Sequence, residues 1–296
     1  MLNIIKNSFN IVIKNYTITL FFVLCLILVS LVSTRLNSMP TILGFCTIIG
    51  LFFFICAFFA GWFGMIKVAI ENSYQEKTKE EELKDILSLK GEFLNFVGSH
   101  IFPMILTFIL YSILLIVYFN VVVALADKFV GNIDFLYNDT KNILNSESQL
   151  VQYFSTLPKE KITLIFAWQL VLILSVFVFN LFTLLWVPAL FLNKSNSKNS
   201  FKAFLSSLSV IFQKPFGVIG FNLLLGVFYF VVSQLSILGK LHPVLSFLYM
   251  VLWVYFFVFM NVLIFNYYGK NFGNLSDIGA NSIGQDETCA WFCKKI

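Results

Sequence analysis

Long uninterrupted runs of apolar residues dominate this sequence. About twenty apolar residues in a helix are needed to cross a hydrocarbon core roughly 30 Å thick. Lipid offers no hydrogen-bond partner to the backbone, so a spanning segment must close its own bonds as a helix. We therefore expect an all-α bundle of six transmembrane helices. The six predicted spans are Tyr16–Thr34, Thr41–Ile70, Ile101–Ala126, Ile162–Leu192, Phe216–Leu238 and Pro243–Tyr268.

A shorter amphipathic stretch precedes three of the six spans. In each stretch apolar residues recur at helical spacing opposite lysines, which is typical of a helix lying in the membrane interface. The expected apolar faces are Leu2, Ile5, Phe9, Val12 and Tyr16, then Leu83, Ile86, Leu87, Leu94 and Val97, then Phe201, Phe204, Leu205, Leu208 and Phe212. The alternative is that any segment beside a membrane looks amphipathic.

These stretches divide the chain into three copies of one unit, an interfacial helix followed by a two-span hairpin. The copies cover about 1–70, 83–192 and 201–268, and the middle one holds a 35-residue loop, Asp127–Lys161. An odd number of copies differs from the paired inverted repeats of many secondary transporters. We expect a membrane domain over 1–270 and a polar cytoplasmic tail over 271–296.

Composition excludes most other classes of protein. The 296 residues are 59% hydrophobic and only 12% charged, whereas soluble domains average about 25% charged residues. A soluble enzyme, a disordered chain and a nucleic-acid binder are excluded. The runs are also too long for an outer-membrane barrel, whose strands alternate over about ten residues.

Basic residues predict the orientation of the chain in the membrane. The side that holds both termini and the loops 67–100 and 193–215 carries fourteen Lys residues, and the opposite side carries six Lys or Arg residues. The net charge of +5 is therefore a topology signal. We expect both termini in the cytoplasm and the protein in the bacterial plasma membrane.

Prolines and tryptophans give further expectations about the spans. Pro103 and Pro188 lie near expected span ends, where a missing N–H costs little. Trp168 and Trp186 are 18 residues apart, about 27 Å along a continuous helix. Because indole prefers the interface, the two rings are expected to mark the two membrane surfaces. The alternative is that both rings pack against neighbouring helices.

Polar residues inside the spans are the candidate site residues. No span carries a charged residue near its centre, which argues against ion-coupled transport. Asn180, Asn222 and Asn261 are expected either to bond neighbouring helices together or to line a substrate groove. Lys198, Lys202 and Lys214 are candidate contacts for anionic lipid.

Other motifs predict packing rather than chemistry. Small residues spaced four apart, Ala57 with Gly61 and Ala60 with Gly64, favour close helix–helix contact. His100 and His242 are expected at opposite faces of the membrane, so they cannot share a metal. Cys289 and Cys293 alone make an incomplete metal site. We therefore expect no cofactor, no metal and no catalytic residues.

The stretch from Trp186 to Lys214 carries a family resemblance. It reads Trp-Val-Pro-Ala-Leu-Phe-Leu-Asn, a polar turn, then Ala203, Ser207, Val210 and Lys214. Over about Val187–Val232 it resembles a group of uncharacterised bacterial six-span proteins that includes the membrane domain found with glycerophosphodiester phosphodiesterases. The chain lacks that group's acidic residue before the Ala and holds no soluble hydrolase domain. The resemblance implies a bacterial inner-membrane location and no defined activity.

Three functions remain open at the level of sequence. The first is a non-enzymatic membrane protein that organises lipid or a membrane partner, alone or as a homo-oligomer. The second is a transporter or permease for an uncharged or lipid-like substrate, with the three Asn residues lining its groove. The third is a lipid enzyme, which the scarcity of clustered His, Asp and Glu disfavours.

Overall fold

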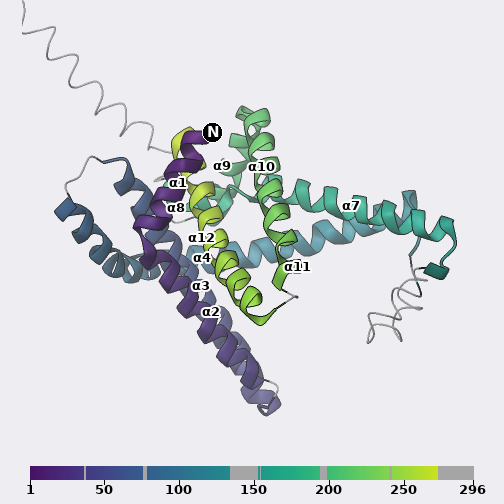
Figure 1. Cartoon of the computed structure of the whole chain (residues 1–296), viewed down its shortest axis with the longest axis horizontal. Coiled ribbons are helices and arrows are strands. Elements are labelled where there is room, and N and C mark those ends of the chain that lie inside the picture. Colours follow the sequence, from purple (N-terminus) through teal and green to yellow (C-terminus); the bar gives the residue numbers. More distant parts are fainter. Residues whose placement is uncertain are drawn as a thin grey trace, which may run out of the picture. The chain divides into compact units, whose positions relative to one another are not determined.

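A computed structural model describes residues 1–36, 38–75, 79–133, 153, 155–193, 199–239 and 242–272. Among these residues the secondary structure is helical and contains no strand. Six helical segments are long and apolar enough to cross a membrane. The helices are α1 Leu2–Lys14, α2 Tyr16–Leu36, α3 Thr41–Ser73, α4 Lys79–Phe129, α7 Lys159–Thr183, α8 Trp186–Leu192, α9 Ser200–Gln213, α10 Pro215–Gln234, α11 Ser236–Gly239 and α12 Pro243–Phe272 (Figure 1).

The chain divides into two compact units, which are described separately. Unit 1 comprises Met1–Ile109 and Thr183–Ile296, and unit 2 comprises Leu110–Phe182. Unit 2 contains the paired ends of α4 and α7. There the Tyr118 hydroxyl donates to the Ser175 carbonyl at 3.0 Å, and the Trp168 indole donates to the Gly131 carbonyl at 2.8 Å.

Three helices form the centre of unit 1. Helices α3, α8 and α12 contact one another in all three pairings. Each contributes one phenylalanine to a mutual cluster, Phe63, Phe191 and Phe265, whose ring centroids lie 5.3–6.1 Å apart. Such edge and offset geometries are favourable between aromatic rings. We call the end of unit 1 where these three helices finish the basal end; its residues are Lys67–Tyr74, Phe191–Asn193 and Phe265–Phe272.

The amphipathic helices surround the centre at the basal end. Helix α1 packs on α12, and α9 packs on α8. Figure 1 shows α1 beside the yellow-green α12, so the first and last helices of the chain are neighbours. The amphipathic part of α4 packs on α3, because Phe93 lies against Gly61 and Phe96 lies against Gly64. The small-residue spacing therefore predicted a real helix–helix contact.

The protein-facing side of α1 and α9 differs from the expected apolar face. Ile4, Ser8, Ile11 and Val12 are buried in α1, while Leu2, Phe9, Ile13 and Tyr16 are more than half exposed. In α9 the buried residues are Ser200, Ala203, Ser207, Val210 and Ile211, and the large exposed ones are Phe201, Leu205 and Phe212. Both buried faces therefore combine branched aliphatic residues with serine, and that of α9 also includes an alanine. Several of the largest apolar side chains, among them Leu2, Phe201 and Phe212, remain exposed.

Short interruptions separate α1 from α2 and α9 from α10. Asn15 has φ −106° and ψ 57°, and its side chain donates to the Ile11 carbonyl at 2.9 Å. Lys214 has φ −136° and ψ 61°. Pro215 follows it and starts α10, and the residue before a proline avoids the helical region. Each amphipathic helix therefore joins its span through one non-helical residue.

The second amphipathic stretch does not end before its span. Helix α4 runs unbroken for 51 residues, with Pro103 inside it rather than at a helix start. The Thr107 hydroxyl donates to the Pro103 carbonyl at 2.8 Å. This bond does not serve the carbonyl that Pro103 frees, which is that of Ser99, because the missing N–H would have bonded the residue four positions earlier; neighbouring groups re-satisfy such carbonyls in membrane helices. The expected separate helix is thus the first part of α4.

The fourth predicted span is interrupted near its end. Helix α7 stops at Thr183 and α8 starts at Trp186. Pro188 has no N–H to bond the Leu184 carbonyl, and its ring clashes with that carbonyl in a regular helix. Trp186 is 1% exposed and donates to the Ser200 carbonyl at 2.9 Å. Trp168 is also buried, so both indoles pack against protein. The two rings are not joined by the one continuous helix that the sequence predicts.

Candidate functional site

The polar residues singled out from the sequence occupy three different environments. Asn180, in unit 2, is exposed, and Asn222 is buried in α10. Asn261 is half-buried, and its side chain donates to the Phe257 carbonyl of its own helix at 2.9 Å. That bond uses one N–H of the carboxamide and stays within α12, so it does not join two helices. No groove formed by the three Asn residues can be read from these positions.

Two of the three candidate lysines lie at the basal end. Lys202 is exposed in the first turn of α9, and its backbone N–H bonds the Asn199 side chain at 3.0 Å, which caps the helix. Lys214 is exposed at the junction with α10, and its Nζ lies 5.1 Å from the centroid of the Phe272 ring. Lys198 lies outside the described residues. The two described lysines therefore flank one helix.

The deepest polar network of unit 1 joins three helices at the basal end. Asn266 of α12 is fully buried; its side chain donates to the Ser8 hydroxyl at 2.9 Å and to the Ile4 carbonyl at 3.4 Å. The Tyr74 hydroxyl, just after α3, donates to Asn266 Oδ1 at 2.6 Å. Tyr74 also bonds the Asn7 side chain. Burial raises the pKa of Tyr74, and the Asn7 bond lowers it by less, so the hydroxyl stays a donor at neutral pH.

Asn266 was not among the expected site residues. It stands near the end of the last apolar run, followed by Tyr267 and Tyr268. Its partner Ser8 is 258 residues away in sequence. The available signal was a carboxamide within an apolar run, the same signal that selected Asn261. Asn266 differs from Asn261 only in its position where α1 packs on α12.

Two further polar clusters lie at the same end. The Tyr268 hydroxyl bonds the side chains of Ser206 and Asn193, which links α12 to α9 and to the end of α8. The Thr107 and Ser200 hydroxyls are 2.7 Å apart. That pair links α4 to the start of α9. Each cluster satisfies buried polar groups across helices, as expected where lipid or protein replaces water.

His100 stands in an aromatic setting beside a lysine. Its ring stacks on Phe191 at 4.8 Å and lies 5.3 Å from the Phe96 ring. The Ser99 hydroxyl lies 2.7 Å from His100 Nδ1. Lys67 Nζ lies over the other neighbour, the Phe96 ring, at 5.6 Å from its centroid. Lys67 and His100 therefore both pack on the Phe96 ring.

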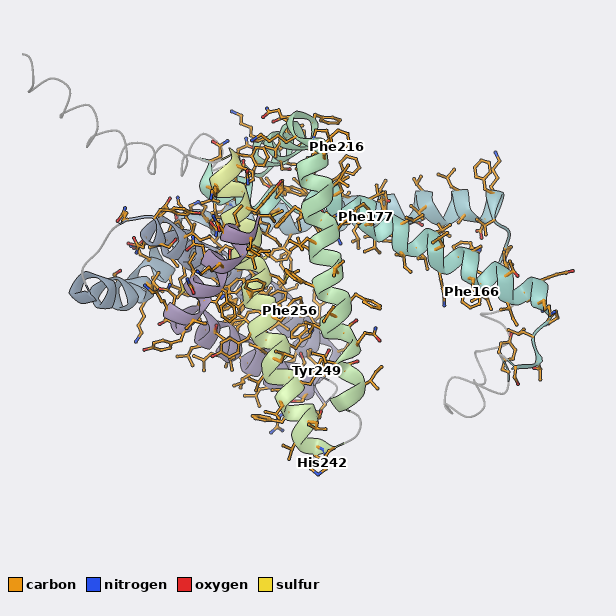
Figure 2. All side chains as sticks on the ribbon, turned by 45° about the horizontal axis from the view of Figure 1, so that its top comes forward. Phe166, Phe177, Phe216, His242, Tyr249 and Phe256 are labelled. Carbon is orange, nitrogen blue, oxygen red and sulfur yellow. The ribbon has the colours of Figure 1, made fainter. Side chains whose placement is uncertain are left out.

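His242 occupies the other end of unit 1. Figure 2 shows it before the start of α12, far along the hairpin from Phe216 near the start of α10. Its Nδ1 accepts a hydrogen bond from the Val244 N–H at 3.2 Å, which is a helix-capping contact. Within the described part of the chain, no group of three His, Cys, Asp or Glu could hold a metal ion.

These features define a multi-pass helical membrane protein with a polar and basic basal end. Comparison with protein-family models, with curated proteins and with solved structures finds no match. The resemblance of Val187–Val232 to the six-span group therefore stays a prediction.

Proposed function

We propose that this is a non-enzymatic protein of the bacterial plasma membrane whose basal end faces the cytoplasm and binds anionic lipid headgroups. Both termini would then be cytoplasmic. The carrying observation is the double character of α1 and α9. Each helix exposes large apolar side chains. Exposed lysines lie on the same helices, Lys6 and Lys14 on α1 and Lys202 on α9. A helix of this kind inserts its apolar face among acyl chains while its lysines meet anionic headgroups.

A shared register supports the proposal that the basal end is built from three related copies. Ile4, Ser8, Ile11, Val12 and Asn15 correspond, 199 residues on, to Ala203, Ser207, Val210, Ile211 and Lys214. Eight of these ten residues form the buried faces, and the last pair forms the two helix junctions. Adding 85 instead gives Leu89, Phe93, Phe96, Val97 and His100, of which Leu89 and His100 are buried and the others are half-buried.

The helix–helix contacts of the amphipathic segments follow the order of the three proposed copies. Each amphipathic segment packs on the second span of the preceding copy: α4 on α3, α9 on α8, and α1 on α12. The last contact joins the first copy to the third, so it closes a ring. Such an arrangement gathers all three amphipathic segments, with their lysines, at the basal end.

Lipid-dependent thermal stability tests this function. Purified protein in detergent should gain more in Tm from phosphatidylglycerol than from phosphatidylcholine. Replacing Lys198, Lys202 and Lys214 together by Gln should remove a large part of that difference, because each lysine near an anionic surface contributes about 1 kcal/mol. The matched control replaces Lys128 and Lys159, two exposed lysines of unit 2. Equal gains in the triple variant and the wild type would refute lipid binding through these residues.

A transporter for an uncharged or lipid-like substrate is the second candidate. Asn222 favours it, since a carboxamide is buried within the apolar helix α10. Uptake assays in vesicles distinguish the two functions. Asn222→Ala should abolish uptake without lowering Tm if Asn222 binds substrate, whereas a fall in Tm with no uptake in the wild type supports the structural role and the first proposal.

A further inference from the structure

The first turn of α10 has no capping side chain. Lys214 precedes the helix, and Pro215, its first residue, has no N–H to offer. The Val218 N–H bonds the Lys214 carbonyl at 3.1 Å. The N–H groups of Phe216 and Gly217 have no partner within the described residues. Two donors and the positive end of the helix dipole are therefore left for an external acceptor.

The side chain of Tyr267 reaches this turn from α12. Its ring stacks on Phe221 of α10, with the ring centroids 3.9 Å apart and the planes 6° from parallel. A Cβ on Gly217 would lie 3.3 Å from the Tyr267 hydroxyl and 3.9 Å from Lys214 Cβ. Because Cα–Cβ bonds tilt toward the start of a helix, this point lies on the side of Gly217 that faces the start of α10. The hydroxyl is therefore beside the uncapped turn.

The Tyr267 hydroxyl has no hydrogen-bond partner in the part of the chain that the structure describes, although the residue is only 5% exposed. Its oxygen is not among the fully buried unpartnered atoms, so it keeps some exposed surface. The neighbouring Tyr268 hydroxyl, by contrast, bonds the side chains of Ser206 and Asn193. Because polar groups in such buried residues are normally hydrogen-bonded, the Tyr267 hydroxyl points to a partner from outside the chain.

Lys214 supplies a positive charge at the same place. Its side chain is exposed, and its Nζ lies 5.1 Å from the centroid of the Phe272 ring. That ring lies 6.1 Å from the Tyr267 ring. Among the described side chains Lys214 forms no ion pair, and an aromatic face attracts a cation without neutralising it. The charge is therefore available to an anion at the start of α10.

We propose that the first turn of α10 binds one phosphate group. Lys214 is the cation, and the hydrogen-bond donors are the Tyr267 hydroxyl and the N–H groups of Phe216 and Gly217. Phosphate oxygens combine negative charge with several acceptor positions, which suits a helix start beside a lysine. The site rests on the proposed function, because the headgroup of an anionic phospholipid is one source of this phosphate. Free phosphate is the other source, and the experiment distinguishes the two.

Tyr267→Phe tests the site without removing a charge or the ring that stacks on Phe221. Native mass spectrometry of the full-length chain in detergent measures the binding of phosphatidylglycerol. Tyr267→Phe should weaken this binding about tenfold, because a hydrogen bond to a charged group is lost. The matched control is Tyr255→Phe, which removes an exposed hydroxyl from the same helix and should bind like the wild type.

Thermal unfolding without any ligand separates a lost contact to phosphate from a damaged fold. Tyr267→Phe should melt no lower than the wild type, because its hydroxyl has no partner among the described residues. A lower Tm in this variant would mean that the hydroxyl serves the fold and would overturn the site. Gly217→Ala adds a methyl group beside the hydroxyl and should also weaken binding, whereas Gly220→Ala, with nothing within 4 Å of the added carbon, should not.

Inorganic phosphate added in place of lipid identifies the source of the phosphate. A gain in Tm that Tyr267→Phe loses, with phosphatidylglycerol binding unchanged, supports the site and assigns free phosphate to it. Equal responses of Tyr267→Phe and the wild type to both probes would overturn the site. If the variant of Lys198, Lys202 and Lys214 loses the lipid response while Tyr267→Phe keeps both responses, the proposed function stands and this site is refuted.

Discussion

The side chain of Asn266 donates a hydrogen bond of 2.9 Å to the hydroxyl of Ser8 and so ties the last helix of the chain to the first. Ser8 in turn donates to the Ile4 carbonyl at 2.8 Å. Both residues are fully buried. An unpaired polar group would be costly in this setting. The first helix of the chain is thus joined to the last by a bond between residues 258 positions apart in the sequence.

Replacing Asn266 should destabilise the fold more than replacing Asn261. Asn266→Ala leaves the Tyr74 hydroxyl and Ser8 without their partner, at an expected cost of about 1–3 kcal/mol. Asn261 bonds the Phe257 carbonyl of its own helix and no other helix among the described residues, so Asn261→Ala is the matched control and should change stability by less than about 1 kcal/mol. Thermal unfolding in detergent measures both variants. Equal losses would contradict the assigned role of the Asn266 network.

Two glycines of α3 should respond to alanine in opposite directions. At Gly64 an added methyl group would overlap the Phe96 side chain, so Gly64→Ala should lower stability by about 1–3 kcal/mol through overpacking. At Gly50 no atom lies within 4 Å of the added carbon. Gly50→Ala should be neutral or stabilising by up to about 1 kcal/mol, because alanine is the better helix former. Unfolding midpoints of the two variants decide the matter, and a tolerated Gly64→Ala would mean that α3 and α4 do not approach so closely.

The transmembrane helices were predictable because their cause is local. Composition and length alone specify a spanning helix, and the described part of the chain holds six such helices. The small residues spaced four apart between Ala57 and Gly64 likewise predicted close packing. Gly61 and Gly64 do pack closely against Phe93 and Phe96. The interruption before α8 also has a local cause, the missing N–H of Pro188, but the apolar run was interpreted as unbroken.

The polar sites were not predictable because their cause is long-range. Asn261 and Asn266 look alike in sequence, five residues apart on one helix. Their roles differ because α1, from the other end of the chain, packs on α12 at Asn266. The faces of α1 and α9 that pack on other helices include Ser8 and Ser207, and hydropathy gives no signal that such residues are buried. Hydropathy alone does not separate the exposed apolar residues of these helices, such as Leu2 and Phe212, from the buried ones, such as Ile4 and Val210.

Alkaline pH should weaken the basal end through Tyr74. Its pKa is raised in the folded protein, mainly by burial, so the folded state keeps this proton at pH values where the unfolded chain has lost it. The contribution is fully present below the unfolded pKa of about 10 and is lost as pH rises through the folded pKa. Tyr74→Phe cannot titrate. The difference in Tm between the wild type and Tyr74→Phe should be constant up to about pH 9 and shrink above pH 10; a difference that stays constant to higher pH would contradict the raised pKa.

A double-mutant cycle should detect coupling between Thr107 and Ser200, which connect α4 to the start of α9. Their hydroxyls lie 2.7 Å apart, and the Trp186 indole donates to the Ser200 carbonyl rather than to its side chain. Thr107→Val and Ser200→Ala therefore remove the hydroxyl pair while leaving the indole bond in place. Interhelical hydrogen bonds in membrane proteins contribute about 0.6 kcal/mol on average and up to about 1.7 kcal/mol. We expect a coupling free energy in this range from the unfolding of both single variants and the double variant. Exposed Ser99 on α4 and half-buried Ser233 on α10, each bonded to a carbonyl of its own helix, are the matched control pair and should show additive losses. Additivity at Thr107 and Ser200 would mean that each hydroxyl is satisfied within its own helix, as Thr107 can be through the Pro103 carbonyl.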